Sequence, residues 1–129
     1  MALPLPVTHH PRIAVVDDSE AVRRSLLVLL GSRGYDVDAY PGGPELLAAV
    51  GPAGYDCFVI DLKLDRADGT QLLSALRKLG FNQPAVLMSG WEVDSLERLA
   101  KQTGFAAHVR KPMMEISLAD VLGRLLGRQ

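Results

Sequence analysis

Short apolar runs alternate with longer amphipathic segments along the chain. Residues 13–16, 57–60 and 85–88 are continuous apolar runs, a pattern typical of strands that are buried on both faces. Residues 35–40 instead alternate polar and apolar positions, which predicts a half-exposed strand at the edge of a sheet. A last short strand is predicted at 106–109. The chain therefore contains five candidate strands.

Between these runs, apolar residues recur with the period of an α-helix. The first helix has Ser19 as its expected N-cap and is predicted to end near Gly31 or Gly34. The second is confined to 45–50, because proline and glycine flank it on both sides. Further helices are predicted, in chain order, from Leu72 to Leu79, over 92–102 with Leu96 and Leu99 facing inward, and from Leu118 to Leu126 with a capping box formed by Ser117 and Asp120.

Strand and helix thus alternate five times with short connections. Such alternation predicts a doubly wound α/β fold, in which five helices cover both faces of a five-stranded parallel sheet. In folds of this kind, ligands bind beyond the carboxyl ends of the strands, near the point where the strand order reverses. The residues that follow each strand are therefore the first candidates for a functional site.

Chemically useful side chains follow four of the five predicted strands. They are, in chain order, Asp17 with Asp18, Asp61, Ser89 and Lys111. Any single strand can end in a polar residue simply because strands end at water, but three carboxylates, a hydroxyl and an ammonium group at one edge are much less expected by chance. Clustered carboxylates repel one another unless a positive charge lies among them, so a cation is implied. A donor set of oxygens without histidine or cysteine favours Mg²⁺ over Ca²⁺ and Zn²⁺.

Magnesium in such a site usually supports phosphate chemistry. Neither glycine-rich phosphate-binding pattern follows a strand, so a nucleotide is not the expected ligand. With no base-activated serine or cysteine evident, the remaining nucleophile is a carboxylate, which can form an aspartyl phosphate. Asp61 is the best placed, alone after a central strand, while Ser89 and Lys111 would donate a hydrogen bond and a positive charge to phosphoryl oxygens.

Composition narrows the class of protein. The chain has 129 residues, 14 Lys plus Arg against 15 Asp plus Glu, and one cysteine, as expected of one globular domain that needs no disulfide or structural metal. Its net charge of −1 argues against a nucleic-acid surface, and no apolar run approaches the ~20 residues that cross a membrane. Residues 1–11 contain three prolines and lack a signal-peptide pattern. We therefore expect an extended leader that packs little, and a cytoplasmic location.

Taken together, the strand-end motifs resemble those of the receiver domain of bacterial two-component response regulators. The motifs are Val16-Asp17-Asp18, Asp61, Asp68-Gly69, Ser89-Gly90 and Lys111-Pro112, and the resemblance covers residues 12–129. It implies the flavodoxin-like receiver fold. Residues 22–26 and the pair Gly34-Tyr35 are also similar to receivers that precede helix-turn-helix output domains.

The resemblance implies a role for each acidic residue. Asp61 would accept a phosphoryl group from the phosphohistidine of a histidine kinase or from a small phosphodonor. Asp18 would bind Mg²⁺ directly and Asp17 mostly through water. Further ligands to the ion would come from Asp61 and from the backbone carbonyl of Lys63.

The resemblance also implies how the phosphoryl group is sensed. Ser89 would follow it and Lys111 would pair with it, and the peptide bond between Lys111 and Pro112 is expected to be cis. Three residues before the lysine, the family usually has a tyrosine or phenylalanine that acts as a rotameric switch, whereas this chain has His108. A histidine on a short strand is more often a packing residue. We hypothesise that His108 takes the switch role and adds a proton dependence.

Two bulky residues stand where the family borders the path of the hydrolytic water. They are Lys63, two residues after Asp61, and Trp91, two residues after Ser89. This predicts slow loss of phosphate from Asp61, although Trp91 is equally compatible with an exposed loop aromatic. Asp65 stands where the family often has proline, which predicts a more mobile loop.

The leading hypothesis is a phosphorylation-controlled signalling switch that is not an enzyme. Phosphate on Asp61 would change the packing of the face formed by the fourth helix, the fifth strand and the fifth helix, and so alter a protein contact. The expected partners are a sensor histidine kinase or phosphotransfer protein, and either a downstream protein or a DNA-binding output domain outside these residues. A homodimer formed on phosphorylation is also considered, whereas direct binding to nucleic acid or to a membrane is not expected.

Two alternatives stay open at this point. One is a Mg²⁺-dependent phosphohydrolase with an aspartyl-phosphate intermediate, and the other is a binding module that works without phosphorylation. The last predicted helix ends near Gly127, two residues before the end of the sequence. Both a single-domain regulator and a piece of a longer regulator therefore fit.

Overall fold

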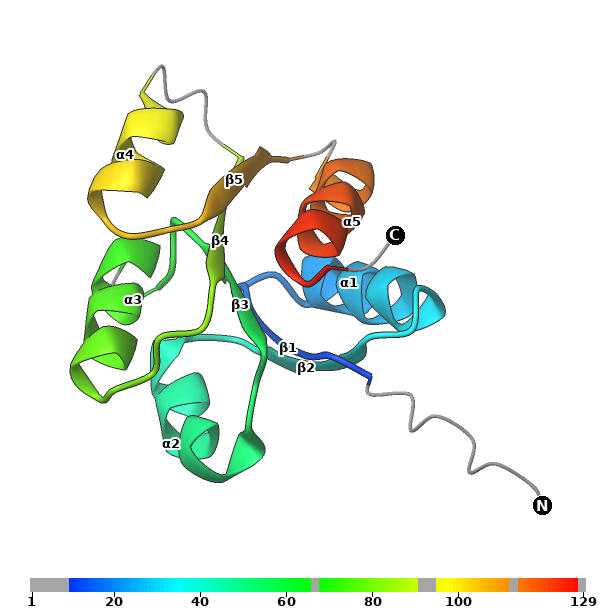
Figure 1. Cartoon of the computed structure of the whole chain (residues 1–129), viewed down its shortest axis with the longest axis horizontal. Helices are drawn as coiled ribbons and strands as arrows, with labels where there is room; N and C mark the ends of the chain where they lie inside the picture. Colours follow the sequence, from blue (N-terminus) through cyan, green and yellow to red (C-terminus); the bar gives the residue numbers. More distant parts are fainter. Residues whose placement is uncertain (1–9, 66–67, 91–94, 112–113, 128–129) are drawn as a thin grey trace.

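A five-stranded sheet forms the centre of the computed structural model, which describes residues 10–65, 68–90, 95–111 and 114–127. All pairings are parallel, in the order β2-β1-β3-β4-β5 (Figure 1). The strands are β1 (Arg12–Val16), β2 (Asp36–Tyr40), β3 (Cys57–Asp61), β4 (Ala85–Ser89) and β5 (Ala107–Arg110), and the helices are α1 (Glu20–Ser32), α2 (Gly43–Ala53), α3 (Gly69–Lys78), α4 (Leu96–Gln102) and α5 (Met114–Leu125). The predicted doubly wound α/β class is confirmed.

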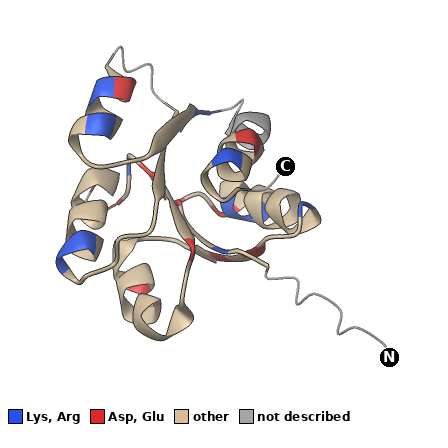
Figure 2. Ribbon diagram, viewed as in Figure 1, with Lys and Arg blue, Asp and Glu red and all other residues tan. Residues whose placement is uncertain are grey.

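The helices cover both faces of the sheet. Helices α1 and α5 lie on one face, and α2, α3 and α4 lie on the other (Figure 1). Strand β3 shows why the central strands are apolar at every position: Phe58 and Ile60 join the core beneath α2, α3 and α4, whereas Cys57 and Val59 join the core beneath α1 and α5. Charged residues lie mainly on the helices and at the ends of strands (Figure 2).

The edge position of β2 agrees with its alternating pattern, because none of its five residues is fully buried. Strand β1 lies between β2 and β3, so the chain leaves β1 for β2 on one side and later returns to β3 on the other. The strand order therefore reverses at the carboxyl ends of β1 and β3. This is the place where a doubly wound sheet most often binds its ligand.

The first helix begins and ends as its sequence predicts. The side chain of Ser19 accepts a hydrogen bond from the backbone N–H of Val22 at 3.3 Å. Gly34, two residues after the end of α1, has a φ of 90°, a value that glycine adopts without strain. These two residues set the direction in which the chain leaves β1 and enters β2.

Some predicted helix boundaries are wrong. Helix α2 runs beyond the predicted 45–50, because a proline in the first turn lacks only an N–H that has no partner there, and because Pro52 falls in the last turn. Helix α5 begins at Met114, so Ser117 lies inside it and cannot cap it. Leu79 lies just beyond α3 and is 60% exposed.

Smaller shifts affect α4, β5 and the leader. Helix α4 begins at Leu96, while the predicted positions 92–94 lie outside the described residues, and β5 is shifted by one residue from 106–109. The expectation of a loosely packed leader fails at its last residue, since Pro11 is buried and its carbonyl accepts a 3.0 Å hydrogen bond from the N–H of Asp36. Within the described ranges, no helix is both long and apolar enough to cross a membrane.

Candidate functional site

Three carboxylates meet where the strand order reverses. Asp17 and Asp18 follow β1, and Asp61 is the last residue of the neighbouring strand β3, where Val16 is paired in register with Ile60. One carboxylate oxygen from each residue lies within 4.8 Å of the other two. Asp17 and Asp61 are buried, whereas Asp18 is exposed. The structure thus brings together the acidic residues that the strand-end pattern singled out.

Lys111 lies between two of these carboxylates. Its Nζ donates to Oδ2 of Asp17 at 2.6 Å and to Oδ2 of Asp61 at 3.1 Å. The lysine follows β5, and its backbone N–H donates to the carbonyl of Ser89 at 2.9 Å, which ties it to the end of β4. The protein itself therefore supplies part of the positive charge that the acidic cluster requires. Three carboxylates against one ammonium group still leave an excess of two negative charges.

Burial shapes the protonation of this cluster. Removal from water, followed by the negative charge of Asp17, raises the pKa of Asp61 to about 6. The ammonium group of Lys111 and the backbone N–H of Lys63 oppose this rise only in part. For Lys111, burial alone would lower the pKa, but its hydrogen bond to Asp17 and the charge of Asp61 outweigh burial and raise it. The folded protein therefore stabilises the ionised form of Asp61 less than water does.

The Asp68-Gly69 motif lets α3 approach the site. The side chain of Asp68 accepts from the N–H of Gln71, and the side chain of Gln71 accepts from the N–H of Asp68, which together form a capping box. A Cβ atom on Gly69 would lie 2.3 Å from the backbone oxygen of Asp61. Only glycine fits there, because the start of α3 packs directly on the backbone of Asp61.

Ser89 ends β4 and is fully buried. It lies at the same edge of the sheet as Asp61, whose neighbour in register on β4 is Met88. The serine thus comes from the strand beside that of Asp61, as the strand-end pattern predicts. Its hydroxyl is the one neutral polar group that the pattern placed at this edge.

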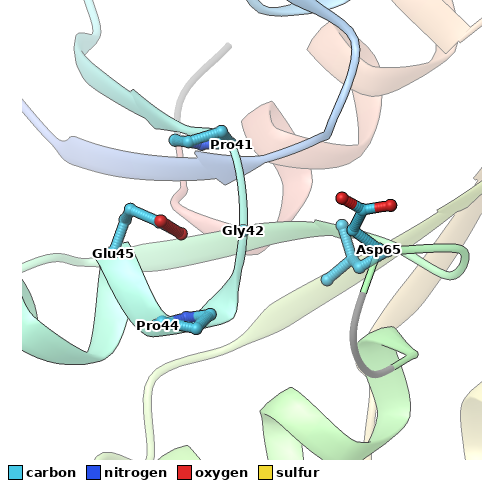
Figure 3. A pocket seen from close by; sticks show the side chains of 6 residues that line it. Pro41, Gly42, Pro44, Glu45 and Asp65 are labelled. Carbon is cyan, nitrogen blue, oxygen red and sulfur yellow. The ribbon is translucent and has the colours of Figure 1, made fainter.

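A shallow groove borders the site. It has a volume of about 220 Å³ and is lined by Pro41, Gly42, Pro44, Glu45, Leu64 and Asp65. Figure 3 shows Glu45 and Asp65 on either side of the segment around Gly42, which connects β2 to α2. Lys63, two residues before Asp65, is exposed, and its backbone N–H binds the carboxylate of Asp61. Leu64 and Asp65, on the loop that follows Asp61, thus line this groove.

His108 lies apart from the acidic cluster. It is a half-buried residue of β5, paired in register with Leu87, and it lines a groove of about 270 Å³ between α4 and α5. Charged residues Glu97, Lys101 and Arg124 line the same groove. Two other predicted features, Trp91 and the peptide bond before Pro112, lie outside the described residues.

One residue of the site was missed by the sequence reasoning. The guanidinium group of Arg23, on α1, donates to the backbone carbonyl of Asp17 at 2.8 Å. In the sequence Arg23 looks like any charged residue on the outer face of an amphipathic helix. A cation in the first turns of a helix, where the helix dipole disfavours positive charge, was the available signal.

The donor set fits a hard divalent ion. Oxygens from three carboxylates come within reach of one another, and the exposure of Asp18 leaves room for water ligands. Magnesium usually keeps several waters and binds through one or two protein carboxylates. Asp17, Asp18 and Asp61 are therefore the residues of the described chain that would hold it.

Known proteins share this sequence pattern and this fold. A family model described as the response regulator receiver domain matches residues 13–122. The chain is similar to the two-component response regulator PhoP of Pseudomonas aeruginosa, with 34% identity over 120 residues that cover 91% of this chain and 52% of PhoP. It is also similar to the transcriptional regulatory protein FixJ of Azorhizobium caulinodans, with 30% identity over 116 residues that cover 90% of this chain and 55% of FixJ.

The agreement extends to solved structures. A response regulator receiver domain from Methylobacillus flagellatus superimposes with a TM-score of 0.80 and 28% identity, covering 91% of this chain and 99% of that chain. The chain spans about half the length of the curated relatives described above.

Proposed function

Because this chain belongs to the family of response regulator receiver domains, we propose that it is a signalling switch and that Asp61 is its phosphoryl acceptor. The observation that carries the proposal is the position of Lys111, whose ammonium group bridges Asp17 and Asp61 at the reversal of the strand order. A cation held there is available to phosphoryl oxygens as well as to carboxylates.

The proposed step is a transfer between two nucleophiles. A carboxylate oxygen of Asp61 forms a bond to phosphorus, while the bond from phosphorus to the donor's nitrogen or oxygen breaks and its electron pair leaves with the donor. Since the pKa of Asp61 is about 6, the side chain is mostly ionised at neutral pH and needs no general base. When bound, Mg²⁺ would neutralise charge on the transferring group.

Lys111 and Ser89 are the proposed partners of the phosphoryl group. In the structure, Lys111 is shared between Asp17 and Asp61. Once Asp61 carries the phosphoryl group, Lys111 would exchange part of its contact with these carboxylates for the added phosphoryl oxygens. The hydroxyl of Ser89, at the end of the adjacent strand, would donate to another of these oxygens.

The proposal predicts a covalent adduct on one residue. The chain is incubated with Mg²⁺ and acetyl phosphate, and its intact mass is measured. We expect an increase of one phosphoryl group that is absent in Asp61→Asn and in the presence of a chelator. Asp65→Asn removes an exposed carboxylate of the same loop and is the matched control, so it should still form the adduct.

Other outcomes point to other functions. Rapid turnover of general phosphate esters would favour a phosphohydrolase, while the lack of an adduct with any donor would favour a module that binds without phosphorylation. The expected donor in the cell is a sensor histidine kinase or a phosphotransfer protein. The expected output is a contact with a protein or with a DNA-binding domain.

We also propose that the change is relayed through the face formed by α4, β5 and α5. His108 lines the groove between these helices, so a shift of β5 toward the phosphorylated site would alter that groove. The test is amide hydrogen exchange over residues 96–110, with and without the adduct. We expect phosphorylation to change the exchange in the parent chain and to change it much less in His108→Ala, and equal changes would contradict the role of His108.

A further inference from the structure

Every polar group of Asp17, in its backbone and its side chain, takes part in a hydrogen bond. Its N–H donates to the carbonyl of Tyr40 at 3.1 Å. Its Oδ1 accepts from the N–H of Ser19 at 2.9 Å, and its Oδ2 accepts from Lys111 at 2.6 Å. The backbone carbonyl is bound by the side chain of Arg23 at 2.8 Å. The first three partners belong to the sheet edge, the helix cap and the acidic cluster, and Arg23 is the one whose purpose the fold alone does not explain.

The position of Arg23 is unfavourable for a cation, unless its hydrogen bond to Asp17 offsets the cost. It lies near the start of α1, where the helix dipole disfavours a cation. It is also half-buried, which costs solvation of the charge. The adjacent Arg24 is different: its side chain is 79% exposed, and it forms a 3.7 Å ion pair with Glu20.

The carbonyl that Arg23 binds belongs to the peptide unit between Asp17 and Asp18. A peptide unit is planar, so holding its oxygen also orients the N–H and the Cα of Asp18. The same bond thereby constrains the backbone from which the carboxylates of Asp17 and Asp18 both project. Residues that orient metal ligands in this indirect way affect metal affinity without touching the ion.

We propose that Arg23 is a positioning residue for Mg²⁺, which orients the Asp17-Asp18 peptide so that both carboxylates address one ion. This inference rests on the proposed function, because it concerns the same acidic site. Arg23 itself would not contact the ion or the phosphoryl group.

A purely electrostatic role and a positioning role for Arg23 predict opposite changes in Mg²⁺ affinity. If the guanidinium group acted only through its positive charge, its removal would make the cluster more negative and would strengthen Mg²⁺ binding. If it orients the peptide, its removal would weaken Mg²⁺ binding despite the gain in negative charge. The sign of the change therefore separates the two.

The experiment compares Arg23→Met with Arg24→Met. Each variant removes one positive charge from the same turn of α1, but only the first removes the bond to Asp17. The dissociation constant of Mg²⁺ is measured by titration calorimetry, and folding is checked by circular dichroism. We expect roughly tenfold weaker binding in Arg23→Met and equal or tighter binding in Arg24→Met. Raising the Mg²⁺ concentration should then restore adduct formation from acetyl phosphate in Arg23→Met.

Other results would contradict the role of Arg23 or the proposed function. Equal or tighter Mg²⁺ binding by Arg23→Met, with the parent chain binding normally, would overturn the role of Arg23 and leave the proposed function intact. If Arg23→Met does not fold, Arg23→Leu, which likewise has no donor for the carbonyl of Asp17, is measured in its place against the same criterion. A parent chain that binds no Mg²⁺ and forms no adduct would overturn the proposed function and this inference together.

Discussion

At each end of β1, one cationic side chain lies between two carboxylates. At the start of the strand, Arg12 contacts Asp36 at 3.3 Å and Asp38 at 2.9 Å. Beyond its end, Lys111 contacts Asp17 at 2.6 Å and Asp61 at 3.1 Å. Each cation thus contacts two carboxylates at similar distances, while Asp18 adds a third carboxylate to the group beyond the end of β1.

Burial distinguishes the two clusters. The side chains at the start of β1 are 32%, 58% and 44% exposed, whereas Lys111, Asp17 and Asp61 are 21%, 0% and 7% exposed. Water screens the first cluster, so its ion pairs contribute little and serve to shield the edge strand β2. In the second cluster, burial raises the pKa of Asp61 and strengthens every charge interaction. The same pattern of charges is structural when exposed and chemically useful when buried.

Removing the two cations should have very different effects on phosphorylation. Lys111→Met takes away the ammonium group that would stabilise the phosphoryl oxygens. We expect the initial rate of adduct formation from acetyl phosphate to fall roughly 100-fold. Arg12→Met should leave that rate within about twofold, because Arg12 lies at the opposite end of β1. Similar losses in both variants would show that the comparison is mistaken.

Replacing one carboxylate in each cluster should change the free energy of unfolding by different amounts. The pKa of Asp61 is about 6 in the folded chain against an ordinary value of 3.8, so its ionised form destabilises the fold. This penalty is absent below about pH 4, grows as the pH rises and is complete above about pH 7. Without Mg²⁺, Asp61→Asn should therefore raise the free energy of unfolding at about pH 8 by about 2 to 3 kcal/mol.

The matched control for Asp61→Asn is Asp36→Asn, which changes an exposed carboxylate of the other cluster. It should alter the free energy of unfolding by less than about 0.5 kcal/mol at either pH. Urea unfolding at about pH 4 and pH 8 measures both variants. A gain for Asp61→Asn that is as large at low pH as at high pH would contradict the assigned cause.

The smallest effect is expected from salt on the exposed cluster. Arg12→Met should cost about 1 kcal/mol of stability at low ionic strength, and the part due to ion pairs should disappear at about 1 M NaCl. The guanidinium group of Arg12 also lies 5.0 Å from the centroid of the Tyr55 ring. The part of the cost that comes from losing this contact should remain at high salt. Urea unfolding of the parent chain and the variant at both salt concentrations gives the difference. A cost that does not change with salt would mean that packing alone explains the role of Arg12.

The order of the elements was predictable because apolar runs and helical periods are local properties. Errors arose where a proline or a polar residue can either end a helix or lie within it. Pro52 was taken to end the second helix but lies in its last turn, and Ser117 was taken as a cap but lies within α5. Local sequence indicates which residue types can end a helix. It does not show that Ala53, in the last turn of α2, packs against the core.

The sequence by itself determined which residues reach the site. Parallel strands end at the same edge, so Asp17, Asp61, Ser89 and Lys111 had to gather there once the strands were recognised. Only the tertiary structure decided that Lys111, 94 residues from Asp17 and 50 from Asp61, lies between them. It also decided the burial that raises the pKa of Asp61, and the contact of Arg23 with the carbonyl of Asp17. Distances and exclusion of water arise from chain segments that are remote in sequence, and no local pattern encodes them.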